Sequence, residues 1–147
     1  MTPMERFLKF MGLLCFYSYL FLLVSGGLVG YLDPGFELSK SYQIKLDTLD
    51  RQSVNSLFDH LRFLKAYVLG FAAFAIVFRR EIFEARVYNR LFLTTLFLSA
   101  GGRLLTVLVN GKPNSVLIFY MITEFTFGFC ILAYSRITLA RAGSMPQ

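Results

Sequence analysis

The stretch PNSVLIFYMITEFTFGFCILAYS, residues 113–135, carries a single charged side chain, Glu124, near its centre. About 20 residues of helix cross a hydrocarbon core about 30 Å thick, so this stretch is long enough to span a membrane. A charged side chain near the middle of such a helix costs roughly 2.5–3.5 kcal/mol on insertion scales, and it normally has a partner and a function. The stretch therefore predicts a membrane-spanning helix with an acidic centre.

The preceding apolar stretch supplies a candidate partner for this carboxylate. Arg103 is the only charge in residues 91–109. From the helical rise of about 1.5 Å per residue, Arg103 lies about 9 Å and Glu124 about 12 Å below the same membrane surface. The sequence Asn-Gly-Lys-Pro at 110–113 predicts a tight hairpin turn, which makes the two helices neighbours. We therefore expect an ion pair between Arg103 and Glu124.

Composition extends the membrane assignment to the whole chain. Of the 147 residues 56% are hydrophobic and 16% are charged, whereas a soluble domain usually has about 25% charged residues. We predict an all-α, polytopic membrane protein: one domain, residues 1–147, folded as an antiparallel bundle of four transmembrane helices. The approximate spans are 10–31, 61–78, 91–109 and 116–134. The uncharged run 10–32 is longer than a signal-peptide core, so we expect it to be a retained helix.

The segment between the first and second spans is the longest polar part of the chain. Asp33-Pro34-Gly35 predicts a turn. Residues 50–64 carry apolar side chains at spacings of three and four, which indicates a helix that lies on the membrane surface or extends the second span. We expect this short segment to be extracytoplasmic.

Basic residues give the expected orientation and exclude one class of partner. Eight Lys and Arg, from Arg6 to Arg141, flank one side of the spans and six flank the other. The positive-inside rule then places both termini in the cytoplasm. The net charge of +6 is spread along the flanks of the apolar runs, so we expect no nucleic-acid partner. Cys15 and Cys130 lie in apolar runs without metal-ligand spacing, and we expect neither a metal nor a cofactor.

Two further cations complete a candidate polar site. Arg62 and Lys65, in the first turns of the second span, approach the level of Arg103 and Glu124 from the outer side. Secondary candidates are Ser99, Thr106, Asn110 and Tyr120. A polar stripe on the third span carries three of these secondary candidates on one helical face, which we expect to point into the bundle: Thr95, Ser99, Gly102, Thr106 and Asn110.

Three cations beside one carboxylate leave a surplus of positive charge. An anionic or polar head group, water, or carboxylates from residues 31–56 would balance it. Two interpretations remain open. In the first, Arg62 and Lys65 snorkel to the interface and the Arg103–Glu124 pair is a structural bridge. In the second, the cluster faces a ligand cavity.

The sequence GRLLTVLVNGKP at 102–113, followed by Glu124, resembles an uncharacterised family of small bacterial four-helix membrane proteins related to the DoxX-like group. The resemblance covers roughly residues 57–136, and Asp59-His60-Leu61-Arg62 is similar to the element that begins the family's second helix. It implies a four-helix bundle in a bacterial-type plasma (inner) membrane, with Arg62, Arg103 and Glu124 as shared polar positions. DoxX-like relatives are associated with quinone-linked sulfur oxidation as small membrane subunits, so an accessory redox role follows by analogy.

No catalytic motif is recognisable, and no residue is assigned a catalytic role. We expect a non-enzymatic protein of the lipid bilayer that acts as an accessory subunit of a larger membrane complex or binds a small amphiphile, a lipid or a quinone-like molecule, in an outer-half polar cavity. The alternative is a membrane enzyme that uses Glu124 as acid or base on a lipid-like or quinone-linked substrate. A transporter would require a homo-oligomer, a state that the sequence leaves open.

Overall fold

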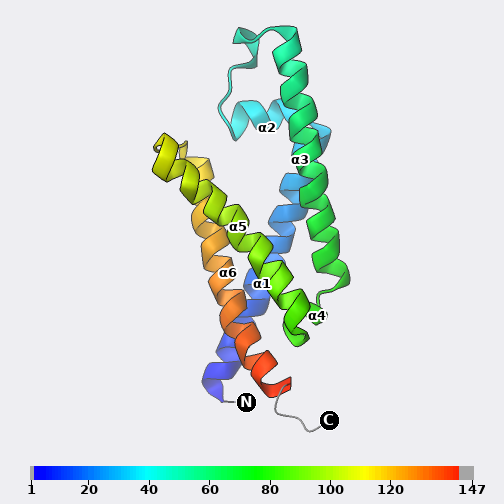
Figure 1. Cartoon of the computed structure of the whole chain (residues 1–147), viewed down its shortest axis with the longest axis vertical. Coiled ribbons are helices and arrows are strands. Elements are labelled where there is room, and N and C mark those ends of the chain that lie inside the picture. Colours follow the sequence, from blue (N-terminus) through cyan, green and yellow to red (C-terminus); the bar gives the residue numbers. More distant parts are fainter. Residues whose placement is uncertain (1, 143–147) are drawn as a thin grey trace.

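The structure is a computed structural model that describes residues 2–142, with the side chains of residues 2–140. Arg141, one of the basic flanking residues, lies outside the described side chains. The described part of the chain forms these helices in order: α1 (Pro3–Leu32), α2 (Pro34–Lys40), the 3-10 helix η1 (Leu46–Thr48), α3 (Arg51–Val77), α4 (Glu81–Glu84), α5 (Arg86–Asn110) and α6 (Ser115–Ala142) (Figure 1). Four of them, α1, α3, α5 and α6, are long and apolar enough to cross a membrane.

The long helices contain the predicted spans and, with one exception, extend beyond them. The exception is the end of the second span, predicted at 78, where α3 ends at Val77. The predicted limits followed the charge-free runs, whereas the helices end at capping residues. Thr2 and Glu5 form a capping box at the start of α1, and the Asp50 side chain accepts hydrogen bonds from the first turn of α3. Residues 51–60 therefore extend the second helix, one of the two alternatives left open for them.

The two connections on either side of α3 contain short helices that the sequence analysis did not predict. Asp33 interrupts the helix as expected, but its side chain accepts a hydrogen bond from Phe36 N and so starts α2 at Pro34. The connection after α3 forms α4, whose Ile82 and Phe83 are buried in the bundle. Both short helices arise because the loops carry apolar side chains that can be buried against the long helices.

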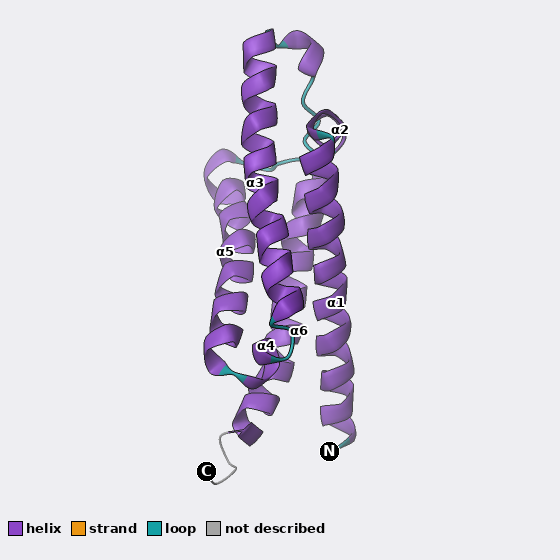
Figure 2. Ribbon diagram, turned by 90° about the vertical axis from the view of Figure 1, so that its right-hand side faces the viewer, coloured by secondary structure: helices purple, strands orange, loops and turns teal. Residues whose placement is uncertain are grey.

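The long helices lie side by side (Figure 2). Helix α1 packs against α3 on one side and α6 on the other, while α5 packs against α6. The hydrophobic core lies toward the end of the bundle that carries α4, the start of α1 and the end of α6 (Figure 1). There the Phe16 ring lies 5.2 Å from the Phe83 ring and 5.5 Å from the Phe92 ring, measured between centroids. Fewer apolar residues are buried toward the opposite end of the bundle, among them Leu38 and Leu61.

Candidate functional site

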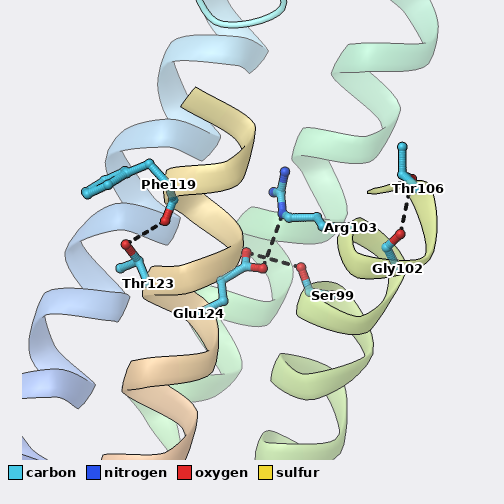
Figure 3. A network of polar contacts seen from close by, with 7 residues as sticks. All are labelled: Ser99, Gly102, Arg103, Thr106, Phe119, Thr123 and Glu124. Atoms are coloured by element: carbon cyan, nitrogen blue, oxygen red, sulfur yellow. Dashed lines mark hydrogen bonds and ion pairs between the residues drawn. The ribbon is translucent and has the colours of Figure 1, made fainter. Parts of the chain in front are cut away.

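Glu124 is bound by two side chains of the neighbouring helix α5 (Figure 3). Arg103 donates from Nε to Glu124 Oε2 at 3.2 Å, and Ser99 donates from Oγ to Oε1 at 3.2 Å. The two donors are four residues apart, so one face of α5 presents both to the same carboxylate. The ion pair predicted between Arg103 and Glu124 is thus present.

The pair is shielded from solvent unequally at its two ends. The Glu124 side chain is 12% exposed and the Arg103 side chain 33% exposed. The Arg103 guanidinium also lies over the Tyr120 ring, with Cζ 5.7 Å from the ring centroid, an arrangement that favours a cation. The Glu124 carboxylate and the Tyr120 ring therefore hold the Arg103 side chain against α6.

A second ion pair joins α2 to α3. Lys65 Nζ lies 2.5 Å from Glu37 Oε1, and the side chains are 14% and 10% exposed. The other carboxylate oxygen, Glu37 Oε2, is buried and accepts no hydrogen bond from the described residues. It lies against the backbone of Gly30 on α1, at a place where any β-carbon would overlap it. The lack of a side chain at residue 30 is what allows Glu37 to reach Lys65.

The two ion pairs line one cavity of about 160 Å³. The cavity walls come from α1, α2, α3, α5, α6 and the loop after α2. Its polar lining residues are Tyr19, Ser25, Glu37, Ser41, Tyr42, Lys65, Ser99, Arg103, Tyr120, Thr123 and Glu124. The apolar part of the wall includes Leu22, Leu23, Val68 and Leu117. A partly apolar wall with a few convergent polar groups is the usual character of a small-molecule site.

Tyr42, on the loop after α2, contributes a phenol to this cavity. Burial raises the pKa of Tyr42 above its ordinary value, the negative charge of Glu37 raises it further, and Arg103 opposes both. The phenol therefore stays protonated at neutral pH and can donate or accept a hydrogen bond. The loop itself is held in place by Asn114, whose side chain donates to Ser41 O at 2.9 Å.

The structure brings some of the predicted site residues together and leaves others apart. Lys65, Arg103 and Glu124 line the cavity, as do the secondary candidates Ser99 and Tyr120. Arg62 does not: it is exposed, and its Nε donates to Tyr31 O at 3.3 Å.

The expectation that the polar stripe on the third span points into the bundle is wrong for Thr106 and Asn110. Both are exposed, and Thr106 donates to Gly102 O within its own helix (Figure 3). The reason is that α5 meets α1 and α3 through ring contacts of Tyr88 and Phe92, near its start, and packs along α6. Farther along α5, the Ser99–Arg103 region lines the cavity, whereas Thr106 and Asn110 lie beyond it.

Sequence analysis did not single out Glu37, although it allowed for carboxylates from residues 31–56. With Glu37 included and Arg62 excluded, the cavity holds two cations and two carboxylates. The surplus of positive charge inferred from sequence is therefore not present in the cavity. The signal for Glu37 was its place in the first turn after Asp33-Pro34, a pair suited to begin a helix, on the face that α2 presents to α1 and α3.

Fold and site together define the class: an all-helical protein with four helices apolar enough to cross a membrane and a charged cavity among them. Residues 4–135 match the model of a family described as a domain of unknown function, DUF4345. The chain belongs to this family, which agrees with the resemblance to an uncharacterised family. No curated protein and no solved structure matches the chain.

Proposed function

We propose that the protein is a non-enzymatic membrane protein that binds the head group of a small, neutral amphiphile in the cavity between its two ion pairs. The observation that carries the proposal is that Lys65–Glu37 and Arg103–Glu124 line the same cavity, one pair from each side. If the ion pairs served only to join helices, one pair would be sufficient and no cavity would be needed beside it.

The charges of the cavity favour a head group without net charge. Each cation already has a carboxylate within 3.2 Å, so an added anion would meet two negative groups at once. Hydroxyl or carbonyl groups, in contrast, can accept from Lys65, Arg103 and the phenols without disturbing the pairs. A lipid hydroxyl or a quinone-like carbonyl has this chemistry.

The size of the cavity supports a head group rather than a whole amphiphile. Its volume of about 160 Å³ is close to the roughly 150 Å³ of an apolar cavity that holds a single benzene ring. An aliphatic tail would therefore lie outside the cavity, along the apolar surface of the helices. Large exposed side chains such as Phe21, Phe63 and Phe119 provide that surface.

We extend the proposal to the placement of the protein. The bundle is antiparallel, with both termini in the cytoplasm and the cavity in the outer half of a bacterial inner membrane. The support for this placement is the excess of Lys and Arg at the end that carries the termini. The same cavity is also compatible with a relation to the DoxX-like group and with a role as an accessory subunit of a larger complex.

The cavity gives the enzymatic alternative one specific point in its favour. Glu124 lines open space and so meets the minimum requirement for an acid or base that acts on a bound molecule. The enzyme hypothesis requires that the bound molecule be converted when the protein is incubated with it. Recovery of an unchanged molecule after many hours supports the binding protein.

Native mass spectrometry of the protein extracted gently from its own membrane tests the proposal. We expect a stoichiometric small molecule on the wild type, and at least about tenfold lower occupancy in Glu124→Gln and Arg103→Gln, because a lost charge-assisted hydrogen bond is worth roughly 1.5–3 kcal/mol. Arg62→Gln, which changes an arginine outside the cavity, is the matched control and should retain the molecule. Equal retention by all three variants would reject this cavity as the site, and a protein partner without any small molecule would favour the accessory subunit.

A further inference from the structure

A second hollow lies between α5 and α6, near the end of the bundle where α5 begins. It is a surface groove of about 690 Å³, within the range of about 300–1,000 Å³ usual for ligand pockets. It shares no lining residue with the cavity of the two ion pairs. The groove is therefore a separate site, and nothing in the function proposed above makes use of it.

Three arginines line the mouth of this groove. Arg86 and Arg90 are four residues apart on α5, so they lie on one helical face, and Arg136 faces them from α6. All three are exposed, and none has a carboxylate within ion-pair distance among the side chains that the structure describes. No carboxylate from residues 2–140 lines the groove. Within that part of the chain, the result is a concentrated positive charge without a counter-ion.

Apart from Asn89 and Thr94, the rest of the groove lining is apolar and continues along both helices. Leu93 and Phe97 continue the same face of α5, and Leu132 lies opposite on α6. On α5 the two arginines therefore come first and the apolar side chains follow over about two turns, whereas on α6 Arg136 lies between Leu132 and Leu139. A cationic mouth beside an apolar floor is complementary to a molecule with an anionic head and a hydrocarbon tail.

We propose that this groove binds one anionic phospholipid, with its phosphate between Arg86, Arg90 and Arg136 and an acyl chain along Leu93, Phe97 and Leu132. Guanidinium groups bind phosphate oxygens through paired N–H donors, which makes three unpaired arginines a stronger phosphate site than three lysines. Basic pockets between transmembrane helices are known sites for anionic head groups. The lipid would tie α5 to α6 at the end of the bundle opposite to their hairpin.

The test compares two triple variants that remove the same charge from the same end of the bundle. The groove variant, Arg86→Gln/Arg90→Gln/Arg136→Gln, removes the three arginines that line the groove. The control variant, Arg6→Gln/Arg79→Gln/Arg80→Gln, removes three arginines outside the groove and leaves its lining unchanged. The proteins are placed in nanodiscs of phosphatidylcholine with a minority of phosphatidylglycerol, and retained lipids are counted by native mass spectrometry. We expect one phosphatidylglycerol on the wild type, at least about tenfold lower affinity in the groove variant, and a change of less than about threefold in the control.

The outcomes separate this site from general attraction to an anionic surface. Equal loss in the two triple variants, or equal retention of the two lipids by the wild type, would overturn the proposal. Competition by free glycerol 3-phosphate would also overturn it, because it would show that the groove binds phosphate without a lipid. A dimer whose interface covers the groove and excludes the lipid would overturn it as well. If the groove variant fails to fold, the triple Arg→Lys variant replaces it. That variant keeps the charge and should show intermediate affinity, and affinity equal to that of the wild type would contradict the paired N–H recognition.

Discussion

The Arg103→Met variant is expected to lose about 3 kcal/mol of its free energy of unfolding, because it leaves the Glu124 carboxylate buried without a counter-charge. This is the lower end of the range for a broken buried ion pair. We expect the lower end of the range because the Arg103 side chain is 33% exposed and because Ser99 still donates a hydrogen bond to Glu124 in the variant. The measurement is unfolding in mixed micelles by titration with sodium dodecyl sulfate.

Two further variants show whether the loss comes from the pair. Arg62→Met removes an exposed arginine whose Nε donates a hydrogen bond to Tyr31 O, and it should cost less than about 1 kcal/mol. The double variant Arg103→Met/Glu124→Met removes the charges together and should recover most of the loss, because no unpaired charge remains. A double variant as unstable as Arg103→Met would show that the arginine contributes by packing rather than by pairing.

The second large effect is expected at Gly30. In Gly30→Ala the new β-carbon overlaps the Glu37 carboxylate and comes close to the Lys65 side chain, so the Lys65–Glu37 pair must shift or open. We expect a loss of about 1–3 kcal/mol, the usual cost of overpacking. Hydrogen exchange of residues 34–40 should rise at the same time, because α2 is connected to α3 through this pair.

Gly26→Ala is the matched control for this prediction. It lies one turn earlier on α1, and an added β-carbon there meets no atom within 4 Å. Alanine also has the better helix propensity, by up to about 1 kcal/mol, so this variant should be neutral or more stable. The double variant Gly30→Ala/Glu37→Ala removes the overlapping carboxylate and should return part of the stability. Equal effects of Gly30→Ala and Gly26→Ala would contradict the close contact at Gly30.

The helical architecture was predictable from sequence because its determinants are local. Charge-free runs of about 20 residues, and the Asn-Gly-Lys-Pro hairpin, are sufficient to locate four long apolar helices and the neighbouring pair α5 and α6. The same local signals were less reliable at the helix ends. Asp50 starts α3 well before the charge-free run, since a capping side chain and not hydropathy decides where a helix begins.

The candidate site was only partly predictable. The Arg103–Glu124 pair follows from helix geometry on either side of one short turn, and the structure contains it. The Lys65–Glu37 pair depends on how α2 folds back against α1 and α3, and on the missing side chain at Gly30, neither of which has a local pattern. Arg62 was included because of its depth along the helix, but depth does not determine the face on which a side chain lies.

The most direct test of the central claim, that the cavity between the ion pairs holds a head group, is to fill the cavity. Gly26 lines the cavity and has open space around it, whereas Gly70 on α3 has open space but does not line it. Native mass spectrometry of Gly26→Leu and Gly70→Leu, each extracted gently from its own membrane, would compare the occupancy of the bound molecule. We predict that Gly26→Leu loses the molecule and Gly70→Leu keeps it. Retention of the molecule at wild-type occupancy by Gly26→Leu would contradict the account.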